Sequence, residues 1–235
     1  PAAAEAAFAA MRAEADAMAA QFAQSRAPQH IYSFAGDPAL VAATRAAWRN
    51  ADAESAWMLE TLEETLTINR YWMTQQGWMS NHARARFNKA NLRRYWNAER
   101  EKPRVMFKFG MSHMVRGLSH THVFDIGAQV SELAESIGAK SFHVAVLPGA
   151  GAQHARMDVQ TWRYAPADAG AYDSMGMGPL YAAAFDDAMT LIDLRPMRAL
   201  VSGQRAKRLD ADFVRTVHGY DALLIMTGSS PSANL

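Results

Sequence analysis

The sequence contains no cysteine. This absence excludes a disulfide framework, a thiolate metal site and a cysteine nucleophile. Any hydrolytic chemistry in the chain therefore has to use histidine, carboxylates, serine, or a metal held by histidine and carboxylates. Proteins without disulfides occur in more than one compartment, so the localisation stays open.

Long apolar runs are also missing. No stretch reaches the roughly 18 apolar residues that a helix needs to cross a bilayer. The alanine-rich start carries Glu5, Arg12, Glu14 and Asp16, which the apolar core of a signal peptide would exclude. We therefore expect a soluble protein with no membrane segment.

The chain also lacks an excess of charge of either sign. Twenty-four Lys and Arg residues stand against 23 Asp and Glu residues, which gives a net charge of +1. No overall field would attract a polyanion, so we do not expect nucleic acid as a partner. The expected partner is a small-molecule substrate. With half of its 235 residues hydrophobic, the chain has the composition of a folded globular protein.

Helical periodicity dominates the first hundred residues. Apolar residues recur at spacings of three and four, and Pro28 and Pro103 interrupt the pattern. The predicted helices cover residues 1–27, 40–48, 51–76 and 81–95. The last of these is rich in arginine and lysine, and most of its cations are expected to face water.

Short apolar runs characterise the rest of the chain. They predict strands at 105–109, 142–147, 188–194 and 222–227, with a helix at 125–137 among them. Strands that alternate with helical or irregular segments are typical of a parallel sheet with crossover connections. The expected fold is α/β, a mostly parallel central sheet flanked by helices with a helical N-terminal region. We expect residues 1–100 to pack on the sheet of residues 101–235 within one domain.

The sharpest local feature is the run Lys108-Phe109-Gly110-Met111-Ser112-His113, in which an apolar stretch meets a glycine and then presents a histidine. In an open α/β sheet, ligands bind beyond the carboxyl ends of the strands, where this histidine would lie. Histidine transfers protons near neutral pH, so His113 is the principal catalytic candidate. The alternative is a histidine that caps or packs the following helix.

Arg84 and Asn91 lie seven residues apart, so both project from one face of their predicted helix. If that face looks into a cleft, Arg84 binds a carboxylate or stabilises an oxyanion, and Asn91 contacts the substrate. Arg116, further along the chain, is another expected substrate contact. The alternative for Arg84 is a solvated surface arginine.

His120 and His122 are weaker candidates for the substrate-binding rim. Together with His113 they could supply imidazoles to a zinc or manganese ion. Without a predicted carboxylate ligand nearby, a polar loop before Asp125 is the preferred interpretation. We therefore predict no metal and no cofactor.

Four segments in the same order resemble erythromycin-esterase-like proteins, a family distantly similar to the TraB/Tiki and ChaN-like groups. The resemblance covers about residues 80–232. It rests on the helix with Arg84 and Asn91, the run from Val105 to His113, Met189-Thr190-Leu191-Ile192-Asp193-Leu194-Arg195, and Tyr220-Asp221-Ala222-Leu223-Leu224-Ile225. It implies that His113 is a catalytic histidine and that Arg84 lines the cleft.

Two residues depart from the family pattern. Gly110 stands where the esterases proper have the first residue of a His-x-x-His motif, and Ala85 replaces an aspartate. The family's upstream strand, which delivers a Glu and a His that bind or activate water, has no counterpart before the helices. Either Pro1 begins a fragment, which we favour, or the chain is a reduced homologue without the N-terminal half.

The resemblance implies a hydrolase that acts on an ester or a related carbonyl compound with water as the nucleophile. In it, His113 assists proton transfer and Arg84 steadies the developing negative charge. Two alternatives stay open: a non-catalytic binding module of the same fold, and a metal-dependent Tiki-like or ChaN-like protein with histidine ligands. The missing half further predicts that this chain alone hydrolyses generic esters poorly.

Overall fold

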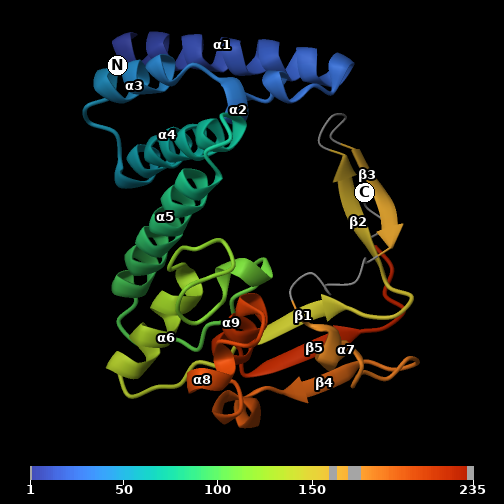
Figure 1. Cartoon of the computed structure of the whole chain (residues 1–235). Helices are drawn as coiled ribbons and strands as arrows, with labels where there is room; N and C mark the ends of the chain where they lie inside the picture. The colour runs from blue at the N-terminus through green and yellow to red at the C-terminus, as the bar shows by residue number, and fades with distance from the viewer. Residues whose placement is uncertain (1, 159–162, 169–175, 232–235) are drawn as a thin grey trace. The chain divides into compact units, whose positions relative to one another are not determined.

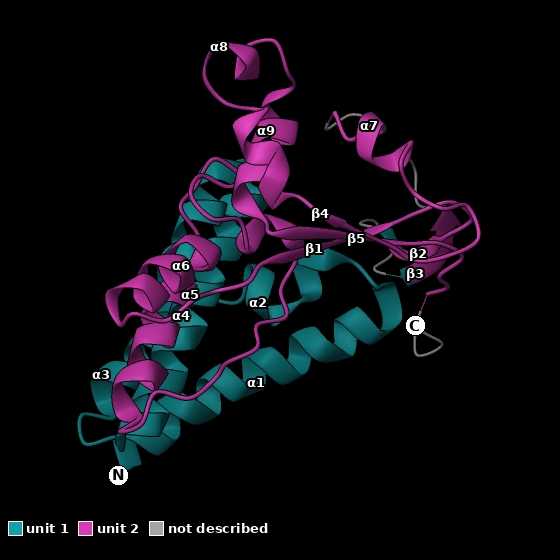
Figure 2. Ribbon diagram, turned by 90° about the horizontal axis from the view of Figure 1, so that it is seen from below, with its two compact units in different colours: residues 1–87, 157–163 teal, residues 88–156, 164–235 magenta. Residues whose placement is uncertain are grey.

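The structure is a computed structural model that describes residues 2–158, 163–168 and 176–231. It divides into two compact units, shown in different colours in Figure 2. The first unit comprises residues 1–87 and 157–163, and the second comprises 88–156 and 164–235. Each unit is described by itself.

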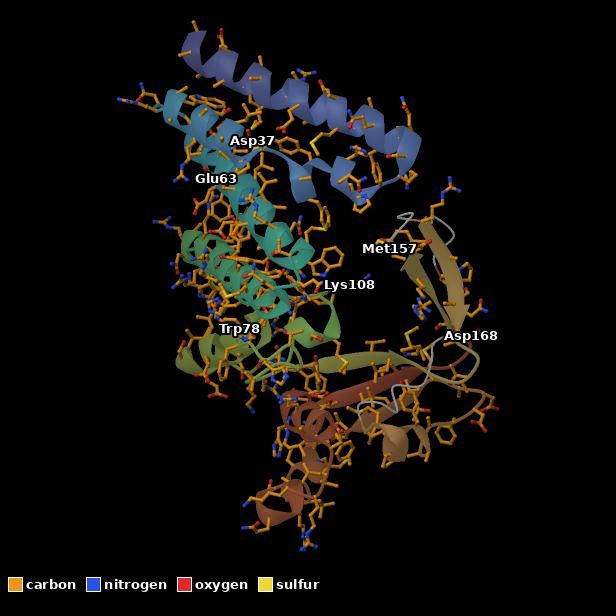
Figure 3. The ribbon with its side chains drawn as sticks, turned by 45° about the horizontal axis from the view of Figure 1, so that its top comes forward. Asp37, Glu63, Trp78, Lys108, Met157 and Asp168 are labelled. Atoms are coloured by element: carbon orange, nitrogen blue, oxygen red, sulfur yellow. The ribbon has the colours of Figure 1, made fainter. Side chains whose placement is uncertain are left out.

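Helices make up most of the first unit. They are α1 (Ala2–Ser25), the 3-10 turn η1 (Pro28–His30), α2 (Tyr32–Ala35), α3 (Pro38–Ala47), α4 (Ala53–Met73) and the first half of α5 (Gly77–Ala98). These bounds confirm the four helices predicted for the first hundred residues. Figure 3 labels Asp37, whose carboxylate caps α3 by accepting the N–H of Ala39 at 2.8 Å.

A small apolar core holds these helices together. Met11 of α1, Val41 of α3, and Leu59 and Leu66 of α4 are buried against one another. Leu59 and Leu66 lie seven residues apart, which is two helical turns, so they share one face of α4. An ion pair between Arg45 and Glu63 adds a contact between α3 and α4.

The second unit contains a three-stranded sheet in the order β1-β5-β4 (Figure 1). Strand β1 (Val144–Pro148) pairs with β5 (Ala222–Met226) in parallel, with Val144 opposite Ala222. Strand β4 (Thr190–Asp193) runs antiparallel to β5. The remaining strands described, β2 (Gln153–Asp158) and β3 (Arg163–Asp168), form a separate two-stranded sheet.

Short helices accompany the three-stranded sheet. They are α6 (Ile126–Ser136), α7 (Gly178–Tyr181), α8 (Gly203–Ala206) and α9 (Ala211–Gly219), with the 3-10 turns η2 (Met111–His113) and η4 (Arg195–Ala199). Helix α6 confirms the predicted helix at 125–137. Alternate residues of the strands enter the core: Leu223 and Ile225 of β5 are fully buried, and Val217 of α9 packs with them.

The predicted mostly parallel central sheet is wrong. Among the described residues there are five short strands in sheets of three and two, and the three-stranded sheet joins one parallel pair to one antiparallel pair. Residues 105–109 form no strand, because no neighbouring strand supplies hydrogen-bond partners for their backbone. Over the described residues taken together, more of the chain is helix than strand, as Figure 1 shows.

No described helix combines the length and the apolar composition needed to cross a bilayer.

Candidate functional site

His113 ends the 3-10 turn η2, which follows the irregular segment 103–110. Hydrogen bonds tie the next residues to the starts of two strands. The Met114 carbonyl lies 2.7 Å from Nδ1 of His143, just before β1, and the Arg116 N–H donates to the Gly219 carbonyl, near the start of β5. The His113 segment therefore lies by the amino ends of β1 and β5, and not beyond the carboxyl end of a strand.

A buried carboxylate orients the His113 ring. Nδ1 of His113 and Oδ2 of Asp125 are 2.7 Å apart, and the Asp125 side chain is 1% exposed. The other oxygen of Asp125 accepts the N–H of Ile126 at 2.7 Å, which caps α6 and holds the carboxylate in place. An ionised carboxylate can only accept, so Nδ1 is the donor in this hydrogen bond.

This arrangement fixes which ring nitrogen of His113 can accept a hydrogen bond. With the proton on Nδ1, the neutral ring presents Nε2 as the acceptor. The His113 side chain is 21% exposed, so part of it is accessible from outside. The role of Asp125 was missed from sequence; the signal that could have found it is its place directly before the apolar helical pattern, where an N-cap is expected.

Close packing of α6 against the His113 segment brings His113 and Asp125 together. A Cβ atom added to Gly127 of α6 would lie 2.3 Å from the backbone carbon of Met114, far inside van der Waals contact. Glycine therefore lets the His113 segment approach the first turn of α6, where Asp125 is the cap.

Gly127→Ala is expected to destabilise the second unit by about 1–3 kcal/mol, because backbone has to shift to admit the methyl group. The free energy of unfolding, measured in urea, checks this value. Gly110→Ala is the control, since its Cβ would meet only the His113 ring at an ordinary 3.6 Å. Equal stability of the two variants would contradict the proposed tight approach.

Arg116, predicted to bind substrate, is engaged inside the protein. Its guanidinium donates to both carboxylate oxygens of Asp221, at 2.8 and 2.5 Å, and to the Ser141 carbonyl at 2.8 Å. Arg198 donates to the same carboxylate at 3.0 Å. Burial raises the pKa of Asp221, but the hydrogen bonds from Arg116, the His143 N–H and Arg198 outweigh it and leave the pKa well below its ordinary value. This cluster gives no support to a substrate contact of Arg116.

The two rim candidates occupy the loop before Asp125. Nε2 of His120 lies 3.2 Å from the Thr216 hydroxyl, and burial lowers the pKa of His120. His122 has a left-handed backbone with φ of 60°, and its N–H donates to the Ser119 carbonyl. Neither observation tests a contact with substrate, so both assignments stay predictions.

Arg84 and Asn91 both lie on α5, but they belong to different units. Arg84 is half-buried in the first unit, whereas His113 is in the second. Asn91, in the second unit, has a buried Oδ1 with no hydrogen-bond partner among the described residues. The shared cleft of Arg84 and His113 stays a prediction.

Within the described residues, no group of three or more His, Asp and Glu side chains is placed to hold a metal ion. The alternative of a site with His113, His120 and His122 as ligands gains no support from the geometry.

Comparison of the chain with protein-family models, with curated proteins and with solved structures finds no match. The resemblance to erythromycin-esterase-like proteins therefore stays a prediction from sequence, and the His113–Asp125 pair is the feature on which a functional proposal can be built.

Proposed function

We propose that this chain carries the proton-transfer part of a hydrolase site, and that the reaction is attack of water on an ester or related carbonyl group. The observation that supports the proposal is the 2.7 Å hydrogen bond between His113 and the buried Asp125. A histidine oriented by a fixed carboxylate is the arrangement that recurs where a weak nucleophile has to lose a proton.

The chemistry of the site follows from this tautomer. Nε2 of His113 takes a proton from water as the water oxygen bonds to the carbonyl carbon, and the carbonyl π electrons move onto its oxygen. The carbonyl π bond then re-forms as the bond to the leaving oxygen breaks, and the imidazolium returns the proton to that oxygen.

General acid–base catalysis contributes about 10²–10⁴-fold, whereas enzymes accelerate reactions by roughly 10⁶-fold or more. A single histidine–carboxylate pair therefore cannot account for efficient turnover. Because this contribution falls short of the acceleration that enzymes reach, we expect the 235-residue chain alone to hydrolyse generic esters poorly. Any longer product that contains the chain should be assayed beside it.

The test is an assay on a panel of esters and lactones with the 235-residue chain and with any such longer product. We expect activity above background to fall by about 10²–10⁴-fold in His113→Ala, the contribution of its proton transfer. His154→Ala, which removes an exposed histidine of β2, is the matched control and should retain activity.

Circular dichroism is the check that each variant is folded. Turnover that survives His113→Ala would remove His113 from the mechanism. Inactivity of every form on every carbonyl substrate would favour the binding module instead.

A further inference from the structure

A second feature of the second unit is a cavity of about 730 Å³. Four segments and Met114 line it: the segments are the end of α5, the irregular segment 102–108, helix α6, and β1 with the residues before it. Cavities of roughly 300–1,000 Å³ are the size that binds small molecules. His113 is not among its lining residues, so the inference does not depend on the proposed function.

The wall of this cavity is apolar and partly exposed. Val144 and Val146 point from β1 to the side opposite the core, and Phe142 before the strand is 64% exposed. Leu133 of α6 and Trp96 of α5 contribute further apolar surface. A contiguous apolar surface that the protein leaves open to water marks a binding site rather than a structural core.

The charged residues of the lining all have one sign. They are Lys102, Arg104, Lys108 and Lys140, and no Asp or Glu is among the described residues that line the cavity. Lys102 donates to the carbonyls of Trp96 and Glu99, both at 2.6 Å. The other three cations form no hydrogen bond or ion pair with the described residues, and Figure 3 labels Lys108 on this segment.

We infer that this cavity binds an amphipathic anion, a small molecule with an apolar chain and a carboxylate head. The apolar wall would bury the chain, because removing apolar surface from water is favourable. The cations of segment 102–108 and Lys140 would pair with the head group. The larger cavity of the first unit has a lining of mixed charge, with Glu5 and Glu54 as well as Arg49, so its charges do not favour an anion.

The probe for this site is dodecanoate with a terminal bromine, used below the concentration at which it forms micelles. Bromine quenches tryptophan fluorescence at short range, and Trp96 lies in the lining. We expect saturable quenching, most of which is lost in Trp96→Phe. Phe142→Ser should weaken the binding of dodecanoate and of dodecanol alike, because it removes part of the apolar wall.

Charge recognition is tested with Arg104→Gln/Lys108→Gln. Since an exposed charge pair contributes about 0.2–1 kcal/mol, loss of both cations should lower the affinity for dodecanoate about two- to thirtyfold, while the affinity for dodecanol stays unchanged. The control Arg205→Gln/Lys207→Gln removes one exposed arginine and one exposed lysine at α8, outside the cavity. It should leave both affinities unchanged.

Several outcomes would overturn the inference. Equal affinity for dodecanoate and dodecanol would show that the cations do not recognise the head group. Quenching that persists in Trp96→Phe would place the probe elsewhere. Binding of an acidic, apolar peptide without binding of dodecanoate would show that the surface recognises polypeptide instead, for example at the free edge of β1.

Discussion

Asp125→Asn is expected to lower the hydrolytic activity proposed for this site by roughly 10²–10⁴-fold, about as far as His113→Ala. The asparagine oxygen can still accept the Ile126 N–H, so the cap of α6 is kept. Its amide nitrogen, however, would donate to Nδ1 of His113. The ring would then carry its proton on Nε2, where it can no longer accept one from water.

A double-mutant cycle gives this prediction its sharpest form. If Asp125 acts through His113, the variant carrying both His113→Ala and Asp125→Asn should be no slower than either single variant. Values of kcat/KM for the four proteins measure this, with the free energy of unfolding as the check on structure. If the losses in kcat/KM of the two single variants add in the double variant, Asp125 affects turnover independently of His113. The proposed pair would then be discarded.

The helices could be predicted because each carries its own signals. The apolar spacing in residues 51–76 predicts α4. In the structure this helix begins after Asp52, whose carboxylate accepts the N–H groups of Glu54 and Ser55. Such signals lie within a few residues of one another, so they do not depend on the rest of the fold.

The sheet could be predicted only in part, because a short apolar run does not say what it pairs with. The runs at 142–147, 188–194 and 222–227 became β1, β4 and β5, but nothing in the sequence of β4 sets its antiparallel direction. The equally apolar run at 105–109 has no strand beside it and stays irregular. Strand pairing is a property of two segments at once.

The site residues, like the strands, could be predicted only where the signal is local. His113 could be singled out from local sequence, whereas its partner is twelve residues away and its hydrogen bond depends on the turn η2 and the packing of Gly127 against Met114. The role of Arg116 was equally hidden, since Asp221 is 105 residues further along the chain. Contacts over such separations follow from tertiary structure.

Asp221→Ala is expected to destabilise the second unit by about 3 kcal/mol, the low end of the range for breaking a buried ion pair, because Arg116 and Arg198 keep partial access to water. The substitution removes the acceptor for both guanidinium groups and for the His143 N–H, which precedes β1. Against a typical total of roughly 5–15 kcal/mol, that loss is large. Hydrogen exchange of the β5 amides measures it locally. The control is Asp193→Ala, which breaks an exposed pair with Arg195 and should cost clearly less.

The contribution of Asp221 should also depend on pH in a defined direction. Its pKa in the folded protein is depressed, whereas the unfolded chain has an ordinary aspartate pKa of about 3.9. The unfolded state therefore takes up the proton first as the pH falls. The stability that Asp221 supplies is complete above about pH 5 and is lost progressively below about pH 4. The difference in unfolding free energy between the native protein and Asp221→Ala should accordingly be constant from pH 5 to about 7 and shrink in acid. A difference that stays constant into acid would mean that the carboxylate is not held by Arg116 and Arg198 in solution, and that Arg116 is free for the substrate contact predicted from sequence.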